Sequence, residues 1–393
     1  YHDIFSTTAM RAVWSDQARI QRYLDVEKAL SVVEARLGVI PSEAAHWGAT
    51  TQDITDTATV LQIRSALLLI EQDLNAVVES LAGLARKYRN TPMAGRSNLQ
   101  QAVPLTFGYK AAVWLAGFHR QIERLDQMKA RLLMGEFGGA VGTLASIGEQ
   151  GLAVQQGMME ELGLLQPPIA WHTVRDTIAE AGCFLGILCG LLDKVATDVK
   201  VMMMTELDEV QEPDEGGGRG ASSTMPQKRN PISCAYITAC SSVVRQHTAS
   251  LLNAMSADFE RATGPWEIEW LVLPEIFCYT AGALAQAKYM LGGLVVHPDN
   301  MVKNLRLTDG LVNTEAVMMA LAPKMGRGNA HDKISAICIA LAQGKARLID
   351  LLEADPEISK ILNRHALEKL LDPTNYVGNS GAMVDRVLND RKG

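Results

Sequence analysis

The chain has 393 residues, of which 48% are hydrophobic and 21% are charged, and its net charge is −7. A chain of this length can bury a large core and is long enough for two or three domains. Its acidic balance, without a run of basic residues, argues against a nucleic-acid surface. The longest strongly apolar run, residues 181–192, is too short to span a bilayer. We therefore expect a soluble cytoplasmic protein with no membrane or nucleic-acid partner.

The cysteines and histidines do not show the spacing of a metal site. The six cysteines form no CxxC pair, and the eight histidines form no HExxH pattern. Most of the cysteines stand in apolar runs, which predicts buried, reduced thiols in a cytosolic protein. We expect no metal.

The first predicted elements lie in residues 1–53, taken as an N-terminal helical domain. Residues 41–45 look like the opening of a helix, with Ser42 as a candidate N-cap. The helix does not continue, because His46-Trp47-Gly48 follows at once. Residues 46–57 then offer two hydroxyls and an amide in sequence, from Thr50, Thr51 and Gln52. Such groups suit a carboxylate ligand, but Thr and Asp are also good helix caps, so both interpretations stay open.

Long apolar stretches at helical spacing follow in residues 54–296. Residues 54–88 carry a wide apolar stripe that includes Leu61, Leu68 and Leu74. Residues 104–134, 176–208, 231–256 and 269–295 are equally long and apolar. Such helices pack side by side in a bundle and bury further faces against other subunits. The predicted fold class is all-α, with this bundle as the central domain.

Residues 297–300, His-Pro-Asp-Asn, predict a break. Shorter helices follow it, and residues 297–393 are expected to form a small C-terminal helical domain.

The most informative segment is the loop at residues 211–230. Residues 220–231 read Gly-Ala-Ser-Ser-Thr-Met-Pro-Gln-Lys-Arg-Asn-Pro, after a glycine-rich run at 215–220. Glycines let a loop fold its backbone N–H groups over an anion. Pro231 suits the first turn of a helix, whose free N–H groups add positive potential. From these residues alone, a mobile anion-binding lid and a solvated linker remain alternatives.

The loop resembles the signature of the fumarase/aspartase superfamily, G-S-S-x-M-P-x-K-x-N-x-x-x-x-E. The matching positions are Ser222, Ser223, Met225, Pro226, Lys228 and Asn230. Ala221 and Ala235 stand where glycine and glutamate are usual. The resemblance implies an enzyme with a three-domain all-α chain, a homotetramer with shared active sites, and no cofactor. It also implies that Ser222 is the catalytic base and that Lys228 and Asn230 bind a substrate carboxylate.

Two further segments resemble the adenylosuccinate lyase and carboxymuconate cycloisomerase branch. Residues 46–57 resemble H-x-G-x-T-S-x-D-x-x-D-T, which implies that Thr50, Thr51 and Gln52 bind a second carboxylate. Relatives carry a helical stretch before this motif. Between Ala45 and His46 this chain has either lost it or the sequence omits it, and we expect the omission.

Residues 95–102 resemble R-T-H-G-Q-x-A. This resemblance makes Arg96, Ser97 and Gln100 weaker candidates for the substrate pocket. Asn98 stands in place of a histidine that is thought to protonate the leaving group. Together, Asn98 and Ala235 replace a His–Glu pair. Asparagine cannot serve as the acid, but a leaving group that departs as a stable anion needs none.

This condition fits the 3-carboxy-cis,cis-muconate cycloisomerases, where ring opening expels a carboxylate with a pKa of roughly 4. Residues 171–176, 266–270 and 372–378 also resemble that branch. His172 is either an acid or substrate ligand, or a histidine bonded to backbone, and Arg175 is a weaker ligand candidate.

We expect proton abstraction beside a carboxylate of a small di- or tricarboxylate, with a C–O bond made or broken at the next carbon. The alternatives are a lyase that releases fumarate or a similar dicarboxylate, as adenylosuccinate or nitrosuccinate lyases do, and an inactive helical scaffold.

Overall fold

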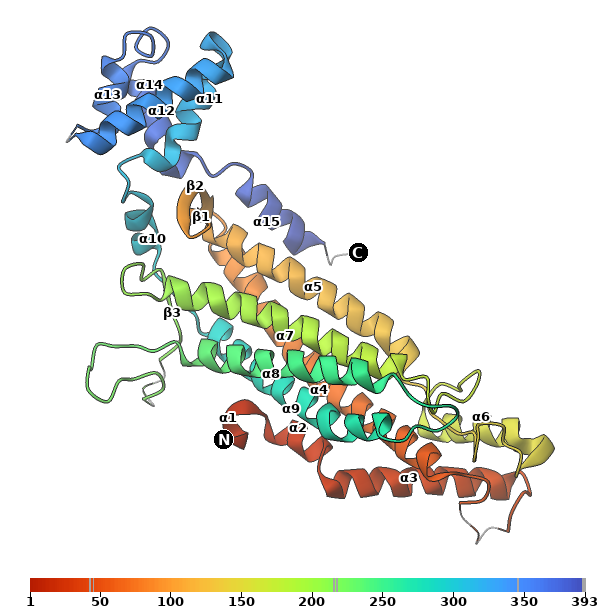
Figure 1. Cartoon of the computed structure of the whole chain (residues 1–393). Helices are drawn as coiled ribbons and strands as arrows, with labels where there is room; N and C mark the ends of the chain where they lie inside the picture. The colour runs from red at the N-terminus through yellow and green to blue at the C-terminus, as the bar shows by residue number, and fades with distance from the viewer. Residues whose placement is uncertain (42–43, 45, 215, 217, 345, 391–393) are drawn as a thin grey trace. The chain divides into compact units, whose positions relative to one another are not determined.

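The computed structural model describes residues 1–41, 44, 46–214, 216, 218–344 and 346–390 (Figure 1). Its described residues form fifteen α-helices and four short strands, which confirms the all-α prediction. The elements are α1 (His2–Phe5), α2 (Thr8–Val13), α3 (Asp16–Arg36), α4 (Thr51–Lys87), β1 (Pro92–Ser97), β2 (Gln100–Thr106), α5 (Phe107–Leu132), α6 (Gly151–Leu162), α7 (Asp176–Met202), β3 (Val210–Gln211), α8 (Ile232–Ala254), α9 (Pro265–Gly292), β4 (Val295–Val296), α10 (Pro298–Leu305), α11 (Thr314–Met325), α12 (Arg327–Gln343), α13 (Leu348–Ala354), α14 (Arg364–Leu371) and α15 (Ser380–Asn389).

The chain divides into two compact units. Unit 1 comprises Tyr1–Val78, Gly117–Asp198 and Asp214–Gly292, and unit 2 comprises the remaining segments, Glu79–Ala116, Val199–Pro213 and Gly293–Gly393. The boundaries between the units fall inside the long helices α4, α5 and α7. The expected three-domain division at residues 53 and 296 stays a prediction.

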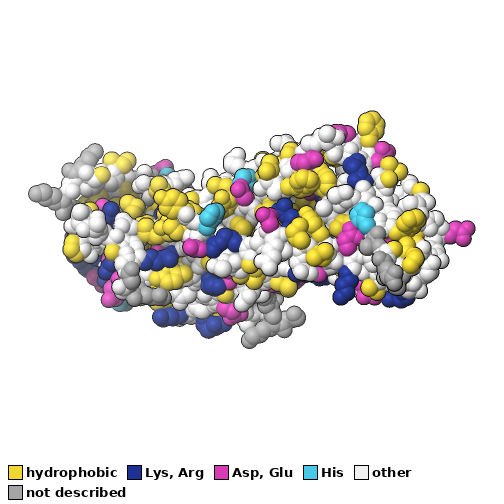
Figure 2. All heavy atoms as spheres, turned by 90° about the horizontal axis from the view of Figure 1, so that it is seen from below, with side chains coloured by type: hydrophobic (Ala, Val, Ile, Leu, Met, Phe, Trp, Pro, Cys, Tyr) yellow, Lys and Arg dark blue, Asp and Glu magenta, His cyan; other side chains and the backbone are white. Residues whose placement is uncertain are grey.

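Unit 1 is built on the predicted long helices. The stripe on α4 is buried at Val60, Ile63 and Leu74, whereas Leu68 is 61% exposed. Other large apolar side chains also reach the surface from the bundle helices, namely Ile187, Val243, Leu252 and Leu271. Figure 2 shows hydrophobic side chains interspersed with charged ones over one face of the molecule. Apolar side chains interspersed in this way are usual on protein surfaces, so the expected assembly of subunits stays a prediction.

Helix α9 is long and apolar enough to cross a membrane by length and composition alone. More than half of its most apolar stretch is buried inside the protein, as in the core helix of a soluble bundle. A β-carbon at Gly282, in the middle of α9, would lie 2.2 Å from the carbonyl oxygen of Phe5. The glycine therefore lets the N-terminal helix α1 lie directly against α9.

Two predicted helices are shorter than the sequence indicated. Residues 104–106 belong to strand β2, where Pro104 pairs with Ala94 of β1. Helix α5 begins only after Thr106, whose hydroxyl accepts the N–H of Tyr109 at 3.2 Å and so caps the helix. Helix α7 ends at Met202, residues 203–207 form turns and a bend, and Asp208 has a φ of 43°.

Between α3 and α4, the described residues form no helix or strand. Ser42 and the expected helix opening around it fall largely outside the described residues. The predicted break at residues 297–300 lies too late in the chain, because α9 already ends at Gly292 and Pro298, Asp299 and Asn300 belong to α10.

Unit 2 contains the antiparallel hairpin of β1 and β2 and the small C-terminal helices. The C-terminal helices share a hydrophobic core formed by Val317, Leu321, Ala330, Ile334, Leu348, Leu352, Ile358 and Leu367.

Candidate active site

The loop that carries Ser222 is closed at its base by Asn230. The backbone N–H and the side-chain amide of Asn230 both donate to the carbonyl oxygen of Gly220, at 2.8 and 3.0 Å. Gly220 has a φ of +74°, and a β-carbon there would lie 2.7 Å from the carbonyl oxygen of Asn230. The predicted carboxylate ligand Asn230 thus closes its own loop in this structure, and α8 begins two residues later at Ile232.

Ser222 stands inside the loop with its hydroxyl oxygen facing backbone donors. Its Oγ accepts the N–H of Met225 at 3.1 Å and that of Thr224 at 3.4 Å. Both donors stabilise negative charge on this oxygen. The Lys228 side chain is exposed, and its ammonium has no partner among the described residues.

Arg219 fastens the loop to the bundle. Its guanidinium donates to Ser233 Oγ on α8 at 2.8 Å and to Gln286 Oε1 on α9. The same guanidinium lies 4.3 Å from the centre of the Tyr289 ring. These contacts fix the residue three positions before Ser222. No motif in the sequence singles out this arginine from its neighbours.

Asp53 organises the start of helix α4. One carboxylate oxygen accepts the N–H groups of Thr50 and Gly139 at 2.8 and 2.9 Å. The other oxygen accepts the N–H of Gly138 at 3.0 Å and lies 2.7 Å from His172 Nε2. The buried carboxylate of Asp53 therefore fixes the backbone at the start of α4, where Thr50 and Thr51 stand.

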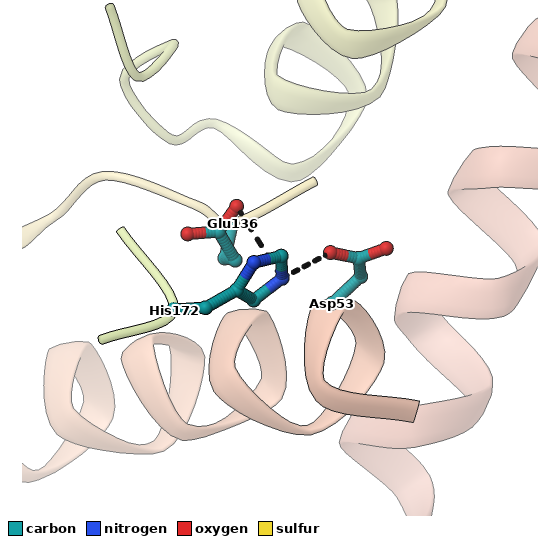
Figure 3. Close-up of side chains that lie close together, drawn as sticks. All are labelled: Asp53, Glu136 and His172. Atoms are coloured by element: carbon teal, nitrogen blue, oxygen red, sulfur yellow. Dashed lines mark hydrogen bonds and ion pairs between the residues drawn. The ribbon is translucent and has the colours of Figure 1, made fainter. Parts of the chain in front are cut away.

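His172 is enclosed between two carboxylates (Figure 3). Its Nε2 lies 2.7 Å from Asp53 Oδ1 and 3.7 Å from Glu136 Oε1. The exposed fractions are 3% for His172 and 0% for both Asp53 and Glu136. Glu136 Oε2 accepts the N–H of Trp171, while Oε1 has no hydrogen bond to any described residue. A side chain buried this deeply does not reach a substrate from solvent.

The electrostatics of this cluster favour a retained proton. Burial raises the pKa of Glu136 to about 7, against the lowering effects of His172 and the Trp171 N–H. Burial alone would lower the pKa of His172, but the hydrogen bond to Asp53 and the charge of Glu136 outweigh it and raise this pKa. The raised pKa favours the protonated imidazole as the partner of Asp53.

These three side chains also form a group whose ligand atoms all lie within 4.8 Å of one another, close enough for a metal ion. The Asp53 oxygens, however, already face four donors, and all three residues are buried. A proton shared within the cluster accounts for the arrangement. The sequence did not predict this cluster, because its three members come from distant segments.

A second buried network holds Arg175. Its guanidinium donates to Asp56 at 2.7 and 3.0 Å and to Glu269 at 2.9 and 2.5 Å. Gln52 donates to Asp56 at 3.0 Å and to the carbonyl oxygen of His172 at 2.8 Å. Arg175 is 2% exposed and Gln52 is 0% exposed. Arg175, just before α7, thus joins Asp56 of α4 to Glu269 of α9, and Gln52 joins α4 to the backbone of His172.

The hairpin in unit 2 presents the other predicted residues. Ser97, Asn98 and Gln100 are exposed at its tip, where Asn98 and Leu99 have φ values of 51° and 64°. Asparagine tolerates this left-handed conformation well, which suits it to the turn.

Arg96 lies one step further back along the hairpin. It donates to the buried carboxylate of Glu209 at 2.9 and 2.7 Å. The pair ties the hairpin to the segment that leads into the Ser222 loop.

Within unit 1, the Ser222 loop and the Thr50 segment lie at opposite ends of α8. The loop precedes the start of α8. Near the other end of α8, Thr248 donates to the carbonyl oxygen of Gly182, close to the start of α7 and thus to Arg175. A helix of 23 residues is roughly 35 Å long at about 1.5 Å per residue. One chain alone does not bring Ser222 to Thr50.

The chain is similar to known proteins over most of its length. The family model described as Lyase matches residues 8–245, and the model described as Adenylosuccinate lyase C-terminus matches residues 310–387. Trans-aconitate decarboxylase 1 of Mycosarcoma maydis is 47% identical over 98% of this chain and 88% of its own length. The 3-carboxy-cis,cis-muconate cycloisomerase of Pseudomonas aeruginosa is 40% identical over 98% and 94%. A crystal structure of a fumarate lyase from Mesorhizobium sp. BNC1 superposes with a TM-score of 0.93, at 44% identity over 100% of both chains.

The alignment with the Pseudomonas aeruginosa cycloisomerase runs over 434 positions, whereas this chain has 393 residues. The cycloisomerase therefore contains residues without a counterpart here. Their position in the alignment is not fixed by its length, so an omitted stretch between Ala45 and His46 stays a prediction.

Proposed function

The chain belongs to the fumarase/aspartase superfamily, and from this premise we propose that it is a cycloisomerase-type enzyme for a 3-carboxymuconate-like unsaturated tricarboxylate. It is an enzyme of the lyase and cycloisomerase class, as its relatives are, rather than an inactive scaffold. The finer assignment rests on the Ser222 loop, in which a serine oxygen faces two backbone N–H groups.

In the ring-opening direction, Ser222 takes a proton from the carbon beside a substrate carboxylate. The electron pair of that C–H bond forms a C=C bond, and the C–O bond at the next carbon breaks. The oxygen leaves as a carboxylate, which needs no proton donor. The loop N–H groups lower the energy of the Ser222 alkoxide that accepts the proton, and one such donor contributes about 3 kcal/mol.

Two groups of donors bind the substrate carboxylates. The ammonium of Lys228, on the same loop as Ser222, has no partner among the residues that the structure describes. Thr50 and Thr51 stand at the start of α4, where helix N–H groups favour anions. His172, Gln52 and Arg175 are better assigned as positioning residues, since burial keeps them from the substrate.

The separation of Ser222 from Thr50 supports a site shared between subunits of a homotetramer. Ser222→Ala should reduce turnover by several orders of magnitude while the assembly stays intact. Refolding a mixture of Ser222→Ala and Thr51→Val subunits should restore part of the activity. Ser222→Ala mixed with Lys228→Ala is the matched control, because both changes damage the same loop and every site keeps a defective copy. If both mixtures remain inactive, the site is built within one chain.

A decarboxylase is the second candidate, because the relative from Mycosarcoma maydis carries that name at 47% identity. Aconitate and 3-carboxymuconate are both unsaturated tricarboxylates. Loss of CO2 also leaves a carbanion, which then takes up a proton. Ultraviolet assays with carboxymuconate and trans-aconitate, together with measurement of released CO2, separate the two reactions.

The runner-up is a lyase that releases fumarate or a similar dicarboxylate. The same ultraviolet assay with adenylosuccinate, argininosuccinate and nitrosuccinate tests it. Turnover of these succinates alone, with none of carboxymuconate or trans-aconitate, would replace the cycloisomerase proposal.

A further inference from the structure

A cavity of about 180 Å³ lies in unit 1 beside the start of α4. It is somewhat larger than an engineered cavity of about 150 Å³ that holds benzene. Residues of α3, α4 and α9 line it, and Thr51 is among them. The space suits one flat arm of a small molecule rather than a whole tricarboxylate.

The walls of this cavity are aromatic. Trp266 and Trp270 pack edge to face, with ring centres 4.8 Å apart at an angle of 76°. Trp14 and Tyr23 also line the cavity. Several aromatic rings around one cavity favour a planar, unsaturated ligand, which they contact by stacking and edge-on.

Two carboxylates line the cavity, but their oxygens are already occupied. Asp56 accepts from both Arg175 and Trp266 Nε1, the latter at 3.0 Å. Both oxygens of Glu269 accept from Arg175. Neither side chain is therefore available to bind a cationic ligand.

Some groups of the lining that can donate lack partners. The guanidinium of Arg19 and the hydroxyls of Tyr23 and Thr51 have no hydrogen bond or ion pair to any other residue that the structure describes. Burial raises the pKa of Tyr23, against the opposing effect of nearby Arg19, so the hydroxyl keeps its proton and can donate. Arg19 and Tyr23 are only partly buried, so water serves these donors in the free protein. A ligand carboxylate beside the arginine would replace that water.

We propose that this cavity is a subsite for one carboxylate-bearing arm of a planar, unsaturated acid. Arg19 and Tyr23 hold the carboxylate, and Trp266 and Trp270 enclose the conjugated chain. The inference rests on the proposed function, in which Thr51 binds substrate, and it adds a preference for flat, conjugated acids over saturated ones.

Equilibrium binding tests the subsite without turnover. Isothermal titration of the full chain carrying Ser222→Ala uses four probes of similar size: benzoate, cyclohexanecarboxylate, benzyl alcohol and benzylamine. We expect benzoate to bind at least tenfold more tightly than each of the other three. Arg19→Gln should weaken benzoate binding at least tenfold. Arg22→Gln, on the same helix but paired with Asp25 at 2.9 Å, should leave it unchanged.

Benzylamine binding as tightly as benzoate, or an Arg19→Gln protein that binds benzoate like its parent, would overturn the subsite. Neither result touches the assignment of Ser222, which is tested by turnover alone. Conversely, full turnover in Ser222→Ala would remove the proposed base but leave the benzoate result standing. Thermal unfolding of each variant shows whether it is folded, and Arg19 is only partly buried, so its replacement should not disturb the core.

Discussion

His172 Nε2 lies 2.7 Å from Asp53 Oδ1, and these side chains are 3% and 0% exposed. An ionised carboxylate only accepts, so the imidazole nitrogen is the donor in this bond. Asp53 in turn accepts backbone N–H groups from Thr50, Gly138 and Gly139. One buried ion pair thus fixes two backbone segments, and one of them carries the predicted carboxylate ligands.

Removing the imidazole should therefore cost stability. We expect His172→Ala to lower the free energy of unfolding by about 3–5 kcal/mol, because it leaves buried carboxylates without their cation. Thermal or urea unfolding at neutral pH measures this. His331→Ala is the control, since that side chain is 68% exposed and its loss should cost less than about 0.5 kcal/mol. Equal, small losses in both variants would show that the buried pair contributes little.

Glu136 should make stability depend on pH. Its pKa is raised from 4.5 to about 7 in the folded protein, so the folded state binds more protons than the unfolded state between these values. The free energy of unfolding then falls as pH rises from 4.5 to about 7. His172 acts in the same direction, because a histidine with a raised pKa loses its stabilising charge as pH rises through that pKa.

Glu136→Gln should flatten this slope and raise stability above pH 7 by up to about 3 kcal/mol. The slope is reduced rather than abolished, because burial also raises the pKa of Glu34 to about 7. Unfolding measured from pH 4 to 8 gives the slope, with the surface variant Glu161→Gln as control. A parent protein whose stability rises over this interval would contradict the assignment.

The sequence indicated the helices well because their apolar spacing is a local signal. The Ser222 loop and the Thr50 segment were likewise found from short motifs. The partners of these motifs were not found, because Glu136, Glu269 and Arg219 act through contacts between distant segments. His172 and Arg175 were noticed, but only the fold shows that each is buried against carboxylates and so holds backbone in place. The sequence also predicted a helix at residues 104–106, but these residues form part of strand β2 and pair with β1.

Gly220 should matter more than a neighbouring glycine of similar conformation. Gly220 and Gly216 have φ values of +74° and +76°, but only at Gly220 would a β-carbon meet the backbone of Asn230. Gly220→Ala should open the base of the loop and reduce turnover at least tenfold without unfolding the bundle. Gly216→Ala carries the same conformational strain and should reduce turnover much less. Equal effects in the two variants would mean that strain alone, and not closure by Asn230, controls the loop.

Asn98 and Ala235, which stand in place of a His–Glu pair, are both exposed. The pair can therefore be restored by substitution. Asn98 stands at the hairpin tip with a φ of 51°, a conformation that histidine tolerates, and Ala235 is exposed in the first turn of α8. The double variant Asn98→His with Ala235→Glu should therefore fold. We expect no gain in the natural reaction, because a carboxylate departs without a proton and its loss is not limited by an acid.

The same variant should act differently on a poor leaving group. Amine loss from adenylosuccinate or argininosuccinate needs protonation, so any trace activity of the parent on these substrates should rise in the double variant but not in Asn98→His alone. Initial rates on carboxymuconate and on both succinates give the comparison. A tenfold increase on carboxymuconate would show that proton donation limits the natural reaction. Efficient amine release by the parent would show that this chain has an acid other than the missing pair. Since His172 is buried 2.7 Å from Asp53, that acid would then have to come from elsewhere.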